Sequence, residues 1–295
     1  MKYHYYPGCS LEGTAVEYDR ATRAVMAALG AELEEIEGWT CCGASAAEST
    51  SELLALALPA RNLALAERCP EPHDLLVPCS ACYLNLKQAA EKMRTHAPLR
   101  ATVASLLQEE GLQLQGRVPV RHLLDVLAVD LGPEAIRARV TRPLSGLRIA
   151  PYYGCQCLRP YAVFDDPEVP TSMEPLIRSL GAEVFPWAVG GRCCGASHMN
   201  TRPEIGTALV AKILEAARGA DAIATVCPMC QMNLEAYQHA VSRSRHADLR
   251  INVVYLPQLI GSAFGLPAAE LGMNFNLALS ADGRKRFAAE TTAAT

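Results

Sequence analysis

The sequence lacks the long apolar runs that membrane-spanning segments need. No stretch of its 295 residues approaches the roughly 20 apolar residues in succession that cross a bilayer. The first residues (1–6, MKYHYY) contain no apolar core of a signal peptide. We therefore expect no transmembrane segment and a protein that is made and kept in the cytoplasm.

An excess of charge of one sign is also missing. Lys and Arg number 27 against 31 Asp and Glu, which gives a net charge of -4, and only 20% of the residues are charged. This balance argues against nucleic-acid binding and against a polybasic membrane contact. Because 50% of the residues are apolar, the chain can build two domains with real cores.

Common redox fingerprints are absent as well. We find no flavin or nicotinamide motif and no closely spaced Cys-x-x-Cys-x-x-Cys run, which ordinary cubane clusters use. The chain therefore does not supply its own electrons if it carries out redox chemistry.

Cysteine, in contrast, is abundant, with twelve residues. An adjacent pair lies in residues 39–45 (WTCCGAS) and again in residues 192–197 (RCCGAS). A disulfide within such a pair strains the peptide between the two residues, and the cytoplasm keeps thiols reduced. The pattern favours metal or redox chemistry over a disulfide framework.

Three further cysteines accompany each pair and complete a doubled five-cysteine pattern. Matched cysteines of the two sets lie 146, 152 and 148 residues apart, so the halves are an internal duplication. The first set is Cys9, Cys41, Cys42, Cys79 and Cys82, and the second is Cys155, Cys193, Cys194, Cys227 and Cys230.

Apolar periodicity predicts an α/β fold in which strands deliver the cysteines to loops. The predicted strands are 3–7, 32–36, 75–78, 118–120, 147–153 and 222–226, and the predicted helices are 16–29, 53–66 (with Pro59 as an irregularity or break), 82–93, 99–111, 121–129 and 205–217. Ligands bind at the carboxyl edge of open α/β sheets. We expect two similar domains, 1–143 and 144–272, which face each other across a pseudo-two-fold cleft. A tail, 273–295, is expected to be an interface segment or disordered.

Several metal chemistries remain open at this point. A zinc site uses four ligands and leaves a fifth cysteine in each half unexplained. A thioredoxin-like dithiol needs only the Cys-x-x-Cys pairs. Five thiolates spread over three loops favour a larger or unusual iron–sulfur cluster.

The doubled pattern resembles the CCG-domain family, and specifically the B-type subunits of heterodisulfide reductases. The resemblance runs from residues 5–14 (YYPGCSLEGT) through Cys230 to residues 256–259 (LPQL). It implies Rossmann-like CCG domains, each holding a non-cubane [4Fe-4S] cluster at the inter-domain cleft through the five cysteines of its set. The ten cysteines are then the cofactor-binding, metal-ligating and catalytic residues of an oxidoreductase that cleaves or forms a disulfide between two clusters.

The same resemblance implies partners and leaves the substrate open. The family partners are the ferredoxin-like C-type and the flavin-containing A-type subunits of heterodisulfide reductase. The substrate is the mixed disulfide of coenzymes M and B in methanogens, and in bacteria the complex is expected either to reduce disulfides or to oxidise sulfane sulfur carried by a lipoate-binding protein. Related CCG proteins are electron-transfer or anchor subunits of succinate:quinone reductases, which is the alternative function. A structural zinc protein is a third possibility for the function.

Two cysteines and several basic and histidine residues lie outside the two sets. Cys69 is expected to be an ordinary thiol, whereas Cys157, two residues after Cys155, is a candidate for supporting a ligand or meeting the substrate. Candidates for tuning a cluster or binding an anionic substrate are Arg192 and His198, followed by Lys87 and Arg159. The six histidines that we interpret as ordinary are His4, His73, His96, His122, His239 and His246.

Overall fold

The computed structural model describes residues 1–44 and 46–287, and it contains two parallel four-stranded sheets of identical topology. The first has the order β2-β1-β3-β4 and the second the order β6-β5-β7-β8. The strands are β1 (Lys2–Tyr5), β2 (Glu32–Glu35), β3 (Leu75–Val77), β4 (Val120–His122), β5 (Arg148–Tyr152), β6 (Glu183–Val184), β7 (Ala222–Thr225) and β8 (Asn252–Tyr255). The prediction of two duplicated α/β units is confirmed.

Helices surround the first sheet. They are α1 (Cys9–Glu12), α2 (Val16–Ala28), α3 (Ala46–Thr50), α4 (Glu52–Arg68), α5 (Ser80–Thr95), α6 (Ala97–Glu109), α7 (Leu123–Asp125), the π-helix η1 (Val126–Leu131) and α8 (Gly132–Arg137). The Ser51 side chain caps α4 by accepting the N–H of Leu54 at 3.3 Å. Pro59 does not break this helix, which continues for two turns beyond it and packs against α5.

The second half repeats the plan with shorter helices. They are α9 (Met173–Ser179), the 3₁₀ helix η2 (Ala196–His198), α10 (Pro203–Ala216), α11 (Pro228–Ala236), α12 (Gln238–Ser244), α13 (Leu256–Ala263), the 3₁₀ helix η3 (Met273–Phe275) and α14 (Ala281–Phe287). The part of the predicted tail up to Phe287 is folded, and both Asn276 and Phe287 are buried. Residues 288–295 of that tail lie outside the described residues.

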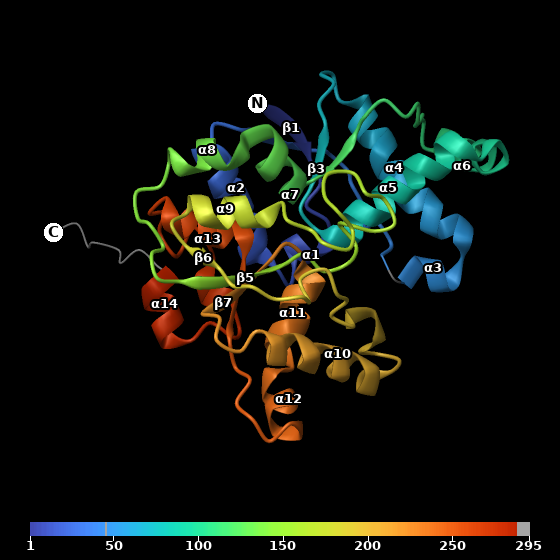
Figure 1. Ribbon diagram of the computed structural model, residues 1–295. Helices are drawn as coiled ribbons and strands as arrows, with labels where there is room; N and C mark the ends of the chain where they lie inside the picture. Colours follow the sequence, from blue (N-terminus) through green and yellow to red (C-terminus); the bar gives the residue numbers. More distant parts are fainter. Residues whose placement is uncertain (45, 288–295) are drawn as a thin grey trace.

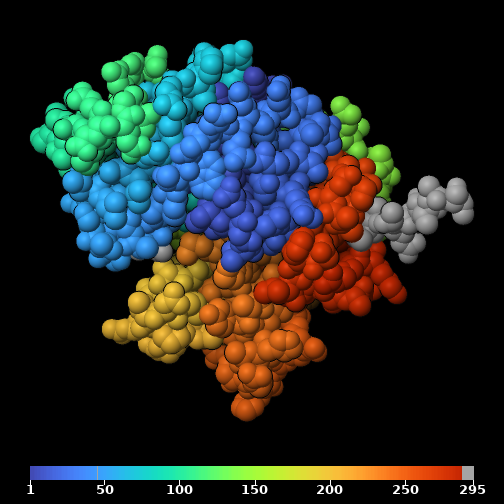
Figure 2. Space-filling model, turned by 180° about the vertical axis from the view of Figure 1, so that it is seen from behind, coloured from blue at the N-terminus to red at the C-terminus, as the bar shows by residue number. Residues whose placement is uncertain are grey.

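The two halves exchange helices (Figure 1). Helix α13, which follows the last strand of the second half, packs against α2 of the first half, and α8 of the first half packs against α9 of the second. Every residue of α13 is buried. Seen from behind, the C-terminal segments lie directly against the N-terminal half (Figure 2). The largest apolar core therefore contains residues of both halves, and smaller cores lie within each half.

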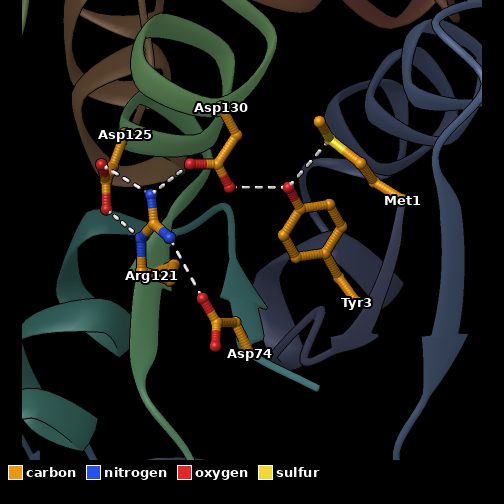
Figure 3. Close-up of polar contacts among 6 residues, drawn as sticks. All are labelled: Met1, Tyr3, Asp74, Arg121, Asp125 and Asp130. Atoms are coloured by element: carbon orange, nitrogen blue, oxygen red, sulfur yellow. Dashed lines mark hydrogen bonds and ion pairs between the residues drawn. The ribbon is translucent and has the colours of Figure 1, made fainter.

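An ionic network connects elements of the first half (Figure 3). Arg121 on β4 contacts Asp74 and Asp130 at 3.0 Å each and also binds Asp125. Asp130 in turn accepts the hydroxyl of Tyr3 on β1 at 2.7 Å. The network joins β1, β4, α7 and η1. Within the described part of the chain, no helix has the length and apolar character needed to cross a membrane.

Candidate metal centre

The ten cysteines gather at the carboxyl edges of the two sheets. Cys9 begins α1 just after β1, and Cys79 follows β3 and precedes α5. In the second half, Cys155 follows β5, and Cys227 follows β7 and precedes α11. The carboxyl ends of parallel strands meet at one edge of a sheet, so segments far apart in sequence arrive at the same place.

Sulfur atoms of each set touch one another in pairs. In the first set, called here the N-terminal cysteine group, the Sγ atoms of Cys9 and Cys41 lie 3.7 Å apart, and those of Cys42 and Cys82 lie 3.3 Å apart. In the second set, the C-terminal cysteine group, the Sγ atoms of Cys194 and Cys230 lie 3.5 Å apart. The structure thus brings together the residues of each predicted set.

The two groups differ in exposure. Cys9 and Cys41 are exposed, whereas Cys155 and Cys193, at the matching positions, are half-buried. The C-terminal group lines a small pocket of about 50 Å³, which Ser80 of the first half also lines. The remaining members of both groups are buried: Cys42, Cys79, Cys82, Cys194, Cys227 and Cys230.

A glycine in each half makes room for a sulfur atom. Gly8 has φ +73°, and a Cβ added there would lie 2.9 Å from the Sγ of Cys82. Gly154 repeats this geometry with φ +70° and a distance of 3.0 Å to the Sγ of Cys230. Real Cβ atoms rarely approach another atom so closely, and side chains disfavour this φ region. Both positions therefore require glycine.

Side chains hold the first Cys-Cys turn at both ends. The Tyr6 hydroxyl donates to the carbonyl of Thr40 at 2.7 Å, and the amide of Asn62 pairs with the N–H and carbonyl of the same residue at 2.9 and 2.8 Å. On the other side, the Nδ2 of Asn85 donates to the carbonyl of Cys42 at 3.1 Å. The backbone between these anchors cannot shift freely, which fixes where its two sulfurs point.

The second Cys-Cys turn repeats two of these anchors, a tyrosine and an asparagine. The Tyr152 hydroxyl donates to the carbonyl of Arg192 at 2.7 Å, and the Nδ2 of Asn233 donates to the carbonyl of Cys194 at 2.8 Å. The sequence interpretation assigned no role to Tyr6 and Tyr152 or to Asn85 and Asn233, which occupy matching positions in the two halves. The repetition itself was the signal that would have found them.

Contacts among the sulfurs favour the thiolate, the metal-binding form of cysteine, at some members of each group and raise the pKa of their partners. The thiols of Cys41 and Cys82 lower the pKa of Cys42 to about 4. Contact with Cys230 and then Cys79 holds the pKa of Cys227 well below its ordinary value. Each group therefore contains a cysteine whose lowered pKa favours the thiolate that binds a metal.

Cations add to this effect only at the C-terminal group. The Cys155 thiol lowers the pKa of Cys193 to about 6, with smaller contributions from the Gly195 N–H and the charges of His198 and Arg159. Arg159 is also bound to the carbonyls of Pro167 and Gly191, so it holds the loop beside the site. The other two candidate cations lie differently: the Arg192 side chain is exposed, and Lys87 lines a separate pocket beside α4.

The two remaining cysteines lie outside the sulfur contacts. Cys157 is buried and donates to the carbonyl of Tyr153 at 3.2 Å, and burial raises its pKa to about 12. Cys69 is half-buried and faces the carbonyl of Leu65 at 3.7 Å. Both behave as protonated structural thiols.

The two groups meet in the centre of the molecule. The thiols of Cys79 and Cys227 lie near each other across the halves: Cys227 raises the pKa of Cys79, and Cys79 lowers that of Cys227. Beside them, His122 is fully buried, and burial lowers its pKa to about 4, so it is neutral. Its Nδ1 accepts the N–H of Leu124 at 3.1 Å, which places the ring proton on Nε2, 3.2 Å from the hydroxyl of Ser80. The sequence interpretation of His122 as an ordinary residue missed this central position.

The donor set fits a polynuclear iron–sulfur centre. Each half offers five sulfur atoms on three loops, with no carboxylate or imidazole among them, and soft thiolates are the ligands of such clusters. Within residues 1–44 and 46–287, no three His, Cys, Asp or Glu side chains converge on a point suited to one metal ion. The sulfurs are thus spread around a volume rather than focused on a single position.

Comparisons with known proteins agree with this geometry. The sequence profile of the cysteine-rich CCG domain matches twice, over residues 3–87 and 149–235, that is, from β1 to α5 and from β5 to α11. The 8-methylmenaquinol:fumarate reductase membrane anchor subunit of Wolinella succinogenes is 37% identical over 94% of this chain and 96% of its own. The B subunit of the ferredoxin/F(420)H(2)-dependent CoB-CoM heterodisulfide reductase of Methanosarcina acetivorans is 30% identical over 93% of both chains. A crystal structure of a hypothetical protein from Helicobacter pylori has the same fold, with a TM-score of 0.74 and 14% identity over 94% of this chain and 52% of that one.

Proposed function

The chain belongs to the cysteine-rich CCG domain family, and from this premise we propose that it is the iron–sulfur subunit of a heterodisulfide-reductase-like complex. The observation that carries the proposal is the pair of complete five-cysteine groups that meet at Cys79 and Cys227. In this proposal each group holds one non-cubane [4Fe-4S] cluster. A bound cluster supplies a one-electron carrier, and two of them match the two electrons that one disulfide requires.

The reaction is the reduction of a disulfide to two thiols with two electrons and two protons, or its reverse. The electrons come from partner proteins, which by family analogy are the ferredoxin-like C-type and the flavin-containing A-type subunits of heterodisulfide reductase. The polar side chains of Gln156 and Ser197 line the pocket at the C-terminal group, and in this proposal they hydrogen-bond a substrate there. The half-buried position of Cys155 and Cys193 limits the access of water to that pocket. In a bacterial complex, the substrate is sulfane sulfur on a lipoate-binding protein or a low-molecular-weight disulfide.

Anaerobic analysis of iron and acid-labile sulfide, combined with EPR, tests this proposal. We expect about eight irons per chain, and a paramagnetic signal that depends on adding a thiol to the oxidised protein. Zinc in place of iron would refute the clusters. Full iron loading without any response to thiols would refute the disulfide chemistry and leave electron transfer alone.

A second function follows from the Wolinella relative, which shares more identical residues with this chain than the methanogen relative does. In this alternative the chain is a CCG-type electron-transfer or anchor subunit of a quinone-linked fumarate or succinate reductase. Purification of the native complex separates the two functions. Copurification with a flavin-containing fumarate reductase, and quinol-dependent fumarate reduction by the complex, would favour this alternative over disulfide chemistry.

A further inference from the structure

A buried tyrosine hydroxyl lies between the two cysteine groups. Tyr18 on α2 has no exposed surface, and its Oη lies 3.0 Å from the carbonyl of Pro78 and 3.1 Å from the carbonyl of Val226. These carbonyls belong to the residues immediately before Cys79 and Cys227. One hydroxyl proton is therefore shared between the backbone segments that carry the innermost cysteine of each half.

The ring that carries this hydroxyl cannot move freely. It stacks on Tyr255 at the end of β8, with ring centroids 4.1 Å apart and planes inclined by 3°. Tyr18 comes from the first half and Tyr255 from the second, and α13, which follows Tyr255, packs against α2. The packing of the exchanged helices thus sets the position of the hydroxyl.

The second half has a matching aromatic residue without a hydroxyl. Phe164 follows Cys155 by nine residues, as Tyr18 follows Cys9. It stacks on His122 at the end of β4, with centroids 6.2 Å apart and planes inclined by 2°. Each aromatic ring therefore lies on the last residue of the fourth strand of the opposite half. Only the ring from the first half provides a hydrogen bond to the centre.

A second bond crosses the same boundary. The hydroxyl of Ser80, directly after Cys79, donates to the carbonyl of Val226 at 3.2 Å. Its own oxygen faces the Nε2–H of His122, so its proton is free for that carbonyl. The backbone before Cys227 is thus bound by two side chains of the first half.

We propose that Tyr18 is a positioning residue that sets the separation of Cys79 and Cys227, and with it the electronic and magnetic coupling between the two metal centres. The inference rests on the proposed function, which supplies the two clusters. Its physical basis is the shared hydrogen bond: a buried donor that serves two carbonyls keeps both segments in register, and its loss lets them move apart.

The Tyr18→Phe variant of the full chain tests the role. It should fold, because the second half already carries phenylalanine at the matching position and the stacking ring is retained. Tyr83→Phe is the matched control, because Tyr83 is also buried and next to Cys82, but its hydroxyl has no hydrogen-bond partner. The readouts are iron and sulfide content, the magnetic interaction between the reduced clusters in EPR, and the kinetics of disulfide reduction.

We expect both variants to retain the iron content of the unaltered protein. The splitting or fast relaxation caused by cluster–cluster interaction should change in Tyr18→Phe alone, and kcat should fall roughly tenfold with little change in KM, because reacting groups are misplaced rather than lost. Unchanged EPR coupling in an iron-replete Tyr18→Phe protein overturns the inference. Lack of iron in the unaltered protein refutes the proposed function instead.

A second variant keeps the test decisive if Tyr18→Phe loses its iron. Ser80→Ala removes the other bond across the boundary and leaves Tyr18 in place. A smaller change of EPR coupling in the same direction supports positioning by these hydroxyls. If Ser80→Ala keeps full iron and normal coupling, the hydrogen bonds at this boundary do not set the coupling and the inference fails.

Discussion

At the scale of single residues, the site requires glycine at the positions where a Cβ would collide with a sulfur atom. Gly8→Ala should lower iron content, because the new Cβ meets the Sγ of Cys82 at 2.9 Å. The matched control is Gly30→Ala, where φ is +75° but a Cβ meets no atom within 4 Å. Both changes carry the backbone cost of a positive φ, on the order of 1–2 kcal/mol. We expect both to lower the melting temperature and only Gly8→Ala to lower iron per folded chain. Equal iron content in the two variants would contradict the steric argument.

The ligand set gives a second prediction at this scale. Cys155→Ser should lose the cluster of the C-terminal group, which is about half of the bound iron if each group holds four irons. Cys157→Ser, two residues away, should keep all of it, because Cys157 bonds to the carbonyl of Tyr153 and contacts no sulfur of the group in the hydrogen-bond network. Iron analysis of both purified variants is the measurement. Loss of iron in Cys157→Ser would add this residue to the ligands.

At the scale of elements, a buried carboxylate fixes the C-terminal segment to α11. Glu235 accepts the N–H groups of Leu277 and Ala278, each at 3.2 Å. Burial nevertheless raises its pKa to about 7, and the nearby Glu17 adds to the rise. Because the folded protein favours the protonated form, stability should be greatest below the unfolded pKa of 4.5 and should decline as pH rises to about 7.

Glu235→Gln tests this pH dependence. The shift corresponds to roughly 3 kcal/mol between the two pH limits. We expect the variant to lose most of this difference, because its amide is neutral throughout and still accepts a backbone N–H. Melting temperatures at pH 5 and pH 8 measure the effect, with the exposed Glu204→Gln as the control. If all three proteins show the same decline with pH, Glu235 is not its source.

Sequence patterns predict the helices and strands of this fold better than they predict which of these elements pack against each other. The strands that end at Cys9, Cys79 and Cys227 were predicted because apolar runs and turn residues are local signals. The exchange of α8 and α13 between the halves was not, because an apolar helix face does not record which helix covers it. The folded segment up to Phe287 escaped prediction for a similar reason. Its polar composition gave no sign that Asn276 would bond to the buried Gln258.

Some features of the candidate site can likewise be predicted from the sequence, and others cannot. Spacing alone defines the two sets of cysteines, because the repeat consists of residue types, and their role as ligands stays a prediction. Tyr18 and His122 form hydrogen bonds with backbone groups. Every residue has the same backbone groups, so no pattern of residue types reveals these bonds. The asymmetry between Tyr18 and Phe164 became meaningful only when both rings were found stacked on matching residues of opposite halves.

At the scale of the whole molecule, duplication and helix exchange make the halves depend on each other. The N–H groups of Thr141 and Arg142, in the connection between the halves, bond to the carbonyl of Ala263 in α13 at 3.0 and 2.9 Å. The connection is therefore packed against an exchanged helix rather than loose. We retain the boundary between residues 143 and 144 as a proposal, in which the largest apolar core contains residues from both sides of the boundary.

Separate expression of the two fragments tests this dependence. Residues 1–143 alone leave the face of α2 uncovered, because every residue of α13 is buried in the intact chain and belongs to the other fragment. Exposed apolar surface of this kind leads to aggregation or loss of structure. We expect each fragment alone to be insoluble or to melt without cooperativity. Coexpressed fragments should form a stable one-to-one complex in gel filtration.

The control is a full chain with a protease site inserted between residues 143 and 144. After folding and cleavage at this site, its two halves should stay together. A soluble fragment 1–143 with a cooperative thermal transition would show instead that the first half has a sufficient core, and that the exchanged helices join two independent domains.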